Sequence, residues 1–270
     1  MNVSTSSETT LYTACGWFQS CYATHSPCGR LASSFPKKLP TRLIDIGKHG
    51  STSWILRNLS EDHVPPTSSY VTLSYRWGTN PRLLLLSSNL AQLRRGNPID
   101  DLPQTFKDDI KVAQRFQIQY IWIDALCIIQ DSIEDWEADA PTIRYIYANS
   151  TCNIAASASS GPDDGMFRLR NPEDIRPRTI MSSLFAETPR PHYIFEKGYW
   201  DREIFDGSLH NRGWVFQERF LAPRVLYFGK RQVLWECFSE HRCDGFPQGI
   251  PAHWSDKSVE PLLKYPQDWL

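Results

Sequence analysis

This chain of 270 residues has no long apolar run and no excess of charge of one sign. A helix that crosses a bilayer needs about 20 consecutive apolar residues, and no stretch approaches that length. The 29 Lys and Arg residues nearly balance the 30 Asp and Glu residues, and they are dispersed along the chain. The sequence therefore predicts no transmembrane segment, no polybasic membrane anchor and no nucleic-acid partner.

The sequence also lacks the marks of secretion. Residues 1–13 are polar where a signal peptide needs an apolar core, and the 7 cysteines are odd in number and unevenly spaced. A disulfide framework needs paired cysteines, so a reduced, cytoplasmic location fits better. A glycine-rich phosphate loop and internal repeats are absent too, which excludes repeat architectures and the common nucleotide-binding loops.

The apolar pattern indicates a single α/β domain with terminal extensions. Residues 105–116 show helical spacing after a good N-cap, Thr105, and a second helix from 132 or 135 to 149 is interrupted by Pro141. Strands are predicted at 70–75, 120–123 and 151–157. The order strand, helix, strand, helix, strand predicts a parallel sheet with right-handed crossovers.

Several flanking segments favour additional β-structure. Short strands are predicted within 41–59, a hairpin-like excursion within 158–210, and a β-hairpin around Gly229 and Lys230. Residues 1–40 contain cysteine and histidine but show little periodicity, so we interpret them as a partly disordered lead-in.

Three separated blocks place polar side chains at the end of an apolar run. They are YVTLSYRWG (Tyr70 to Gly78), YIWIDALCIIQD (Tyr120 to Asp131) and NRGWVFQER (Asn211 to Arg219). The first two read as buried strands, and ligands of open α/β sheets bind at the carboxyl ends of strands. The blocks therefore predict one site assembled from distant segments.

These three blocks, in this order, closely resemble the fungal heterokaryon-incompatibility (HET) domain, with its Leu-Ser-Tyr-x-Trp-Gly, Trp-Ile-Asp-x-Leu-Cys-Ile-x-Gln-Asp and Arg-Gly-Trp-x-x-Gln-Glu motifs. The resemblance covers roughly 70–237 and implies a HET domain at 41–240 with its core at 70–219. It also implies a fold similar to the Toll/interleukin-receptor (TIR) domain: a flavodoxin-like parallel sheet flanked by helices, here with extra β-hairpins from both ends.

The resemblance implies an effector of fungal nonself recognition that triggers regulated cell death, through self-association or a nucleotide-binding receptor protein. Many TIR domains hydrolyse NAD, and that comparison assigns catalysis to Glu218 and Asp124. Glu218 would orient the nicotinamide ribose or stabilise an oxocarbenium-like charge. Binding of NAD is assigned to the remaining polar and aromatic residues of the blocks, which are Ser74, Tyr75, Arg76, Trp77, Gln130, Asp131 and Trp214.

Two alternatives remain open. Glu218 could instead form an ion pair with Arg76 or Arg212, which would make the domain a non-catalytic self-assembling or receptor-binding module. The chain also ends soon after the third block, so residues 241–270 could be the tail of a truncated paralogue. A pocket in which Glu218, Asp124 and Tyr75 converge would favour chemistry, whereas a closed cluster would favour a scaffold.

A second group of residues suggests a metal-binding site. Cys15, Cys21, His25 and Cys28 have the spacing C-x5-C-x3-H-x2-C, and four thiolate and imidazole ligands are typical of structural zinc. The spacing matches no common zinc finger, and Cys237, His241 and Cys243 are further candidate ligands. The alternative is reduced cysteines without metal. Cys127 and Cys152 are predicted to be inert core residues.

Overall fold

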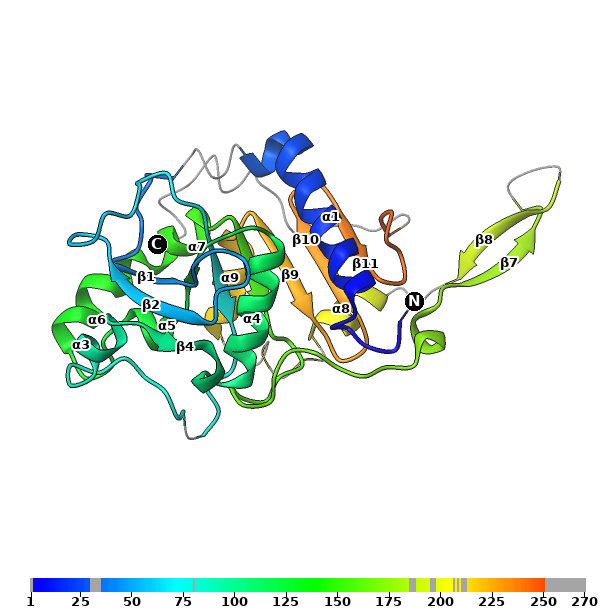
Figure 1. The fold of residues 1–270 in the computed structure, drawn as a ribbon. Helices are drawn as coiled ribbons and strands as arrows, with labels where there is room; N and C mark the ends of the chain where they lie inside the picture. The colour runs from blue at the N-terminus through cyan, green and yellow to red at the C-terminus, as the bar shows by residue number, and fades with distance from the viewer. Residues whose placement is uncertain are drawn as a thin grey trace.

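The computed structural model describes residues 2–29, 35–79, 81–184, 188–194, 198–205, 207, 209 and 213–250, without the side chains of Phe205 and Trp214. A mixed nine-stranded sheet crosses the molecule in the order β11-β10-β9-β6-β3-β5-β1-β2-β4 (Figure 1). Its strands are β1 (Arg42–Asp45), β2 (Ser53–Asn58), β3 (Tyr70–Ser74), β4 (Asn97–Pro98), β5 (Tyr120–Trp122), β6 (Cys152–Ala155), β9 (Arg224–Phe228), β10 (Val233–Cys237) and β11 (His241–Cys243).

The centre of the sheet is parallel. β3 pairs in parallel with β5 and with β6, and β6 pairs in parallel with β9. Every residue of β3 and β6 is buried, as expected for strands covered on both faces. The three predicted strands and the α/β class are confirmed, while the specific likeness to TIR domains stays a prediction.

Helices cover the sheet on both faces. α7 packs against α9, while α1 packs against α4 and β10. The helices are α1 (Glu8–Thr24), α3 (Leu90–Leu93), α4 (Gln104–Arg115), α5 (Asp124–Cys127), α6 (Ile133–Asp139), α7 (Ile143–Asn149), α8 (Tyr199–Phe205) and α9 (Gly213–Leu221), with 3-10 turns η1 (Ile99–Asp101), η2 (Ala140–Thr142) and η3 (Pro172–Ile175).

Two helix predictions are tested by these bounds. The interruption at Pro141 is confirmed, because η2 separates α6 from α7 there. The N-cap of α4 is Pro103, so the prediction of Thr105 as the cap was wrong. The Thr105 hydroxyl instead donates to the Gly161 carbonyl at 3.2 Å, which ties α4 to the loop after β6.

Antiparallel hairpins extend both edges of the parallel centre, as predicted. β1 and β2 pair with each other and join the sheet through β5, while β9 and β10 form the C-terminal hairpin, which continues into β11. β7 (Arg178–Ser182) and β8 (Arg190–Ile194) form a separate two-stranded arm that projects from the body (Figure 1). This arm is the predicted hairpin-like excursion.

The N-terminal segment, residues 1–40, differs most from the sequence prediction. Instead of a segment without periodicity, it forms α1, which Ser7 caps by accepting from the Thr10 amide at 3.2 Å. Leu11, Ala14 and Phe18 lie buried on one face of this helix. No helix in the described ranges is both long enough and apolar enough to cross a membrane.

Candidate functional site

A cavity of about 410 Å³ lies where the carboxyl ends of β3 and β5 meet α7 and α9. A ligand pocket for a small molecule typically has about 300 to 1,000 Å³. The walls are mostly aromatic and aliphatic, with a few polar groups among them. The lining residues include Trp77, Trp122, Asp124, Gln130, Trp136, Arg144, Tyr147 and Glu218.

Glu218 is held at the cavity wall by hydroxyl donors. The Ser74 hydroxyl donates to Glu218 Oε2 at 2.5 Å, and the Asn153 amide donates to Ser74 Oγ at 2.9 Å. The Tyr147 phenol also lies close to Ser74 and Glu218. Burial, followed by the charges of Glu218 and Asp124, raises the pKa of Tyr147 well above its usual value. The phenol therefore stays protonated and available as a donor.

Asp124 fixes the orientation of Trp77. The Trp77 indole donates to Asp124 Oδ2 at 2.8 Å, and the Ala125 amide at the start of α5 donates to Oδ1 at 2.7 Å. Gly78, the next residue after Trp77, has a φ of 72°, which glycine adopts without steric cost. The Trp-Gly pair of the first block thus turns the chain while the indole ring lies against the cavity.

Gln130 closes the loop that follows α5. Its side-chain amide donates to the Asp124 carbonyl at 3.0 Å and to the Ile128 carbonyl at 2.9 Å. Both bonds shape the polar side of the cavity wall.

The remaining predicted site residues lie elsewhere. Tyr75 is buried edge-on against Phe106, with ring centroids 5.1 Å apart, and Arg76 is half-buried but does not line the cavity. Asp131 is exposed, and the Ser87 amide donates to it at 2.8 Å and lowers its pKa. The Trp214 side chain and Arg212 lie outside the described residues.

The cavity has three aromatic or charged lining residues from outside the three sequence blocks, and none of them was predicted: Trp136, Arg144 and Tyr147. All three come from α6 and α7, the helices between the second block and β6. The Arg144 guanidinium donates to the Tyr145 hydroxyl at 2.9 Å, and its buried Nε has no hydrogen-bond partner among the described residues. The sequence pattern that could have indicated this wall is the helical spacing of Ile143 and Tyr147 directly after the break at Pro141.

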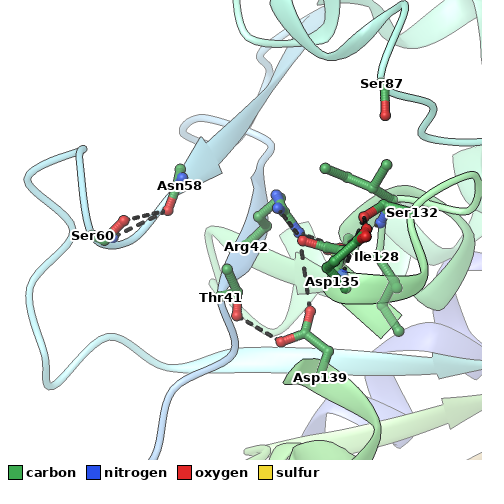
Figure 2. Close-up of polar contacts among 12 residues, drawn as sticks. Thr41, Arg42, Asn58, Ser60, Ser87, Ile128, Ser132, Asp135 and Asp139 are labelled. Atoms are coloured by element: carbon green, nitrogen blue, oxygen red, sulfur yellow. Dashed lines mark hydrogen bonds and ion pairs between the residues drawn. The ribbon is translucent and has the colours of Figure 1, made fainter. Parts of the chain in front are cut away.

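A buried ion pair anchors the helix that carries Trp136. Arg42 of β1 donates to both carboxylate oxygens of Asp135 at 2.9 and 2.6 Å, and Thr41 donates to Asp139 at 2.6 Å (Figure 2). The Asp135 carboxylate also accepts from the Ile129 amide at 2.7 Å. Because the guanidinium binds in bidentate fashion, α6 is fixed in orientation against β1.

A second polar cluster lies apart from the cavity. The ligand atoms of Cys21, His25, Cys28 and Cys237 all lie within 4.8 Å of one another and could hold a metal ion. Cys237 takes the place that the sequence prediction gave to Cys15, whose thiol donates instead to the Arg115 carbonyl at 3.4 Å.

The remaining cysteines lie outside this cluster. Cys127 and Cys152 are fully buried, as predicted, and burial raises the pKa of Cys127 to about 12. His241 lies 3.3 Å from Glu236, and Cys243 lies 3.7 Å from the Tyr199 hydroxyl, so neither joins the cluster.

The fold and the cavity define an α/β protein with a cavity of about 410 Å³ at the carboxyl edge of its parallel strands. The family described as Heterokaryon incompatibility protein (HET) matches residues 70–218, which is more than half of the chain. The chain belongs to this family, which implies a role in fungal heterokaryon incompatibility. Comparison with curated proteins and with solved structures found no match.

Proposed function

We propose that this HET protein is an effector of fungal nonself recognition that cleaves NAD and thereby triggers regulated cell death. The observation that carries the proposal is the half-buried Glu218 carboxylate, which faces a cavity of about 410 Å³ beside Trp77. Water would replace nicotinamide at the ribose C1′, and the products would be nicotinamide, ADP-ribose and a proton.

In this proposal, Glu218 stabilises the positive charge that develops on the ribose when the glycosidic bond breaks. Ser74 and Tyr147 hold the carboxylate in position, and the ring of Trp77 offers a face for the nicotinamide. Asp124 acts as a positioning residue, because it holds the Trp77 indole. Arg144 supplies a cation for the pyrophosphate.

A second candidate is a non-catalytic module that self-associates or binds a nucleotide-binding receptor protein. The observation that favours it is the internal bonding of Glu218, since the Ser74 hydroxyl and Asn153 already connect the carboxylate to the sheet. A carboxylate satisfied in this way can serve to join α9 to β3 without any substrate.

The deciding experiment measures nicotinamide release by the purified protein at high concentration, which permits self-association. We expect turnover by the wild type and a loss of about 100-fold or more in Glu218→Gln, because that variant keeps the shape and removes the charge. The matched control is Glu137→Gln, which removes an exposed carboxylate of α6. A folded, assembled wild type without turnover would leave the binding module as the better account.

A further inference from the structure

We propose that Cys21, His25, Cys28 and Cys237 bind one structural Zn²⁺ ion. All four ligand atoms lie within 4.8 Å of one another. In a tetrahedral zinc site with Zn–S bonds of about 2.3 Å, the sulfur atoms lie about 3.8 Å apart. Three thiolates and one imidazole make a closed ligand set, which is typical of structural zinc and leaves no position for substrate.

The ligands come from both ends of the described chain. Cys21 lies in the last turn of α1 and His25 is the C-cap of that helix, whereas Cys237 ends β10. The three thiol residues are fully buried, with no exposed surface. An ion here would therefore join the N-terminal helix to the C-terminal hairpin, with its three sulfur ligands shielded from solvent and the half-buried His25 on the outer side.

The charge balance around the cluster fits a zinc thiolate site. Arg224 is 5% exposed, and its Nε donates to Cys21 Sγ at 3.2 Å. No carboxylate within the described residues forms an ion pair with it, and its Nη1 reaches only the Thr151 carbonyl. A buried guanidinium needs a negative partner. Three thiolates and one divalent cation carry one net negative charge, which Arg224 neutralises.

The surroundings of His25 also match a metal ligand. Nδ1 lies 3.4 Å from Cys237 Sγ, inside the cluster, and Nε2 lies 3.9 Å from Glu240 Oε1. This buried carboxylate oxygen has no hydrogen-bond partner among the described residues. A metal-bound histidine usually donates its second ring N–H to a carboxylate, which sets the tautomer and the ring orientation.

The main chain after β10 runs beside the cluster, and the Ser239 hydroxyl lies 3.9 Å from Cys28 Sγ. The cluster lies apart from the Glu218 cavity, and none of its residues lines that cavity.

The test is the metal content of protein purified under reducing conditions, measured by plasma mass spectrometry. We expect one zinc per chain in the wild type and in Cys15→Ser, the control that removes a nearby thiol outside the cluster. Cys237→Ser should lose the metal, whereas His25→Cys should keep it, because a fourth thiolate also completes a tetrahedral zinc site.

A spectroscopic arm keeps the test decisive if Cys237→Ser fails to fold. Wild-type protein stripped by a chelator and given Co²⁺ should develop thiolate-to-metal absorption and the visible bands of tetrahedral cobalt, both displaced by Zn²⁺. The proposal is overturned if folded, reduced wild type contains no zinc and gives no cobalt spectrum. A disulfide between Cys21 and Cys28 in protein purified with reductant would overturn it as well.

Discussion

The Glu218 cavity and the C-terminal hairpin (residues 224–237) use the same kinds of side chain with different surroundings. In the cavity, carboxylates and hydroxyls line a space of about 410 Å³. In the hairpin, Glu236 has no exposed surface and accepts from Arg219 at 2.9 and 2.6 Å and from the Tyr227 hydroxyl at 2.5 Å. Polar groups in the first region face room for a ligand, whereas those in the second face one another.

This difference predicts which region governs activity and which governs stability. When a carboxylate at a cavity wall is replaced, the polar groups around it can still be solvated, because the cavity admits water. A carboxylate enclosed by its own donors leaves a buried, uncompensated cation when it is removed. We therefore expect cavity substitutions to reduce the proposed NAD cleavage with little effect on unfolding, and hairpin substitutions to do the reverse.

The largest expected effect is that of Glu236→Ala on stability. The variant leaves the buried Arg219 guanidinium without its anion, so the free energy of unfolding should fall by about 3 to 5 kcal/mol. Urea denaturation measures this, with the exposed Glu137→Ala as the control. A loss similar to that of the control would mean that the two regions do not differ as described.

Asp109 on α4 provides a third case, a buried carboxyl without a donor. Both oxygens lack hydrogen-bond partners among the described residues, and burial, followed by the charge of Asp108, raises the pKa of Asp109 well above its usual value. Its folded-state pKa exceeds the unfolded value, so its favourable contribution is complete below the unfolded pKa and is lost as pH rises through the folded pKa. At neutral pH, Asp109→Asn should therefore stabilise the protein by about 1 to 3 kcal/mol.

Thermal unfolding of this variant at pH 5 and at pH 8 gives the measurement, and the gain should be larger at pH 8. Asp108→Asn is the matched control. It should destabilise the protein, because the Asp108 carboxylate accepts from the Met166 amide and from Gln104, both at 2.7 Å. Equal pH dependence in wild type and Asp109→Asn would contradict the prediction.

A smaller effect on stability is expected for Ser74→Ala, directly behind Glu218 of the cavity wall. The variant removes the hydroxyl that donates to Glu218, so unfolding should become easier by only about 1 kcal/mol. If the proposed NAD cleavage occurs, its rate should fall about tenfold, because the carboxylate loses a positioning donor. Denaturation and nicotinamide release are measured on the same preparation. A stability loss as large as that of Glu236→Ala would mean that Ser74 acts as a structural group, like the enclosed polar groups of the hairpin.

The smallest effect is expected for Arg76→Ala. Arg76 follows Tyr75 at the end of β3 but does not line the cavity, so stability should change by no more than about 0.5 kcal/mol. If the proposed NAD cleavage occurs, its KM should stay within about twofold of the wild-type value. A large rise in KM would mean that the binding surface extends beyond the cavity to Arg76.

The sequence predicted the parallel centre and its two hairpins because strand signals are local. Alternating and β-branched runs identified β3, β5 and β6, and the Gly229 and Lys230 turn identified the C-terminal hairpin. The α1 helix was missed because its exposed face carries aromatic residues. Tyr12 is 79% exposed and Tyr22 is 61% exposed, so the contrast between the two faces is weak.

Missing α1 also led to the inclusion of Cys15 in the metal prediction. Residues four apart lie on the same face of a helix, whereas residues six apart do not. Cys21 and His25 therefore point to the same side, while Cys15 reaches the Arg115 carbonyl on another. With the helix recognised, the sequence itself would have excluded Cys15, although Cys237 would still have been only one of three further candidates beside His241 and Cys243.

The sequence by itself determined the strands, the break at Pro141 and the polar residues that end each apolar run, including Ser74, Asp124 and Glu218. These follow from local preferences and from the rule that parallel strands end at one edge. Only the tertiary structure decided that Tyr147 lies beside Glu218 and that Cys237 lies beside Cys21. Both contacts depend on how separate elements pack across the sheet, and local sequence patterns do not encode those distances.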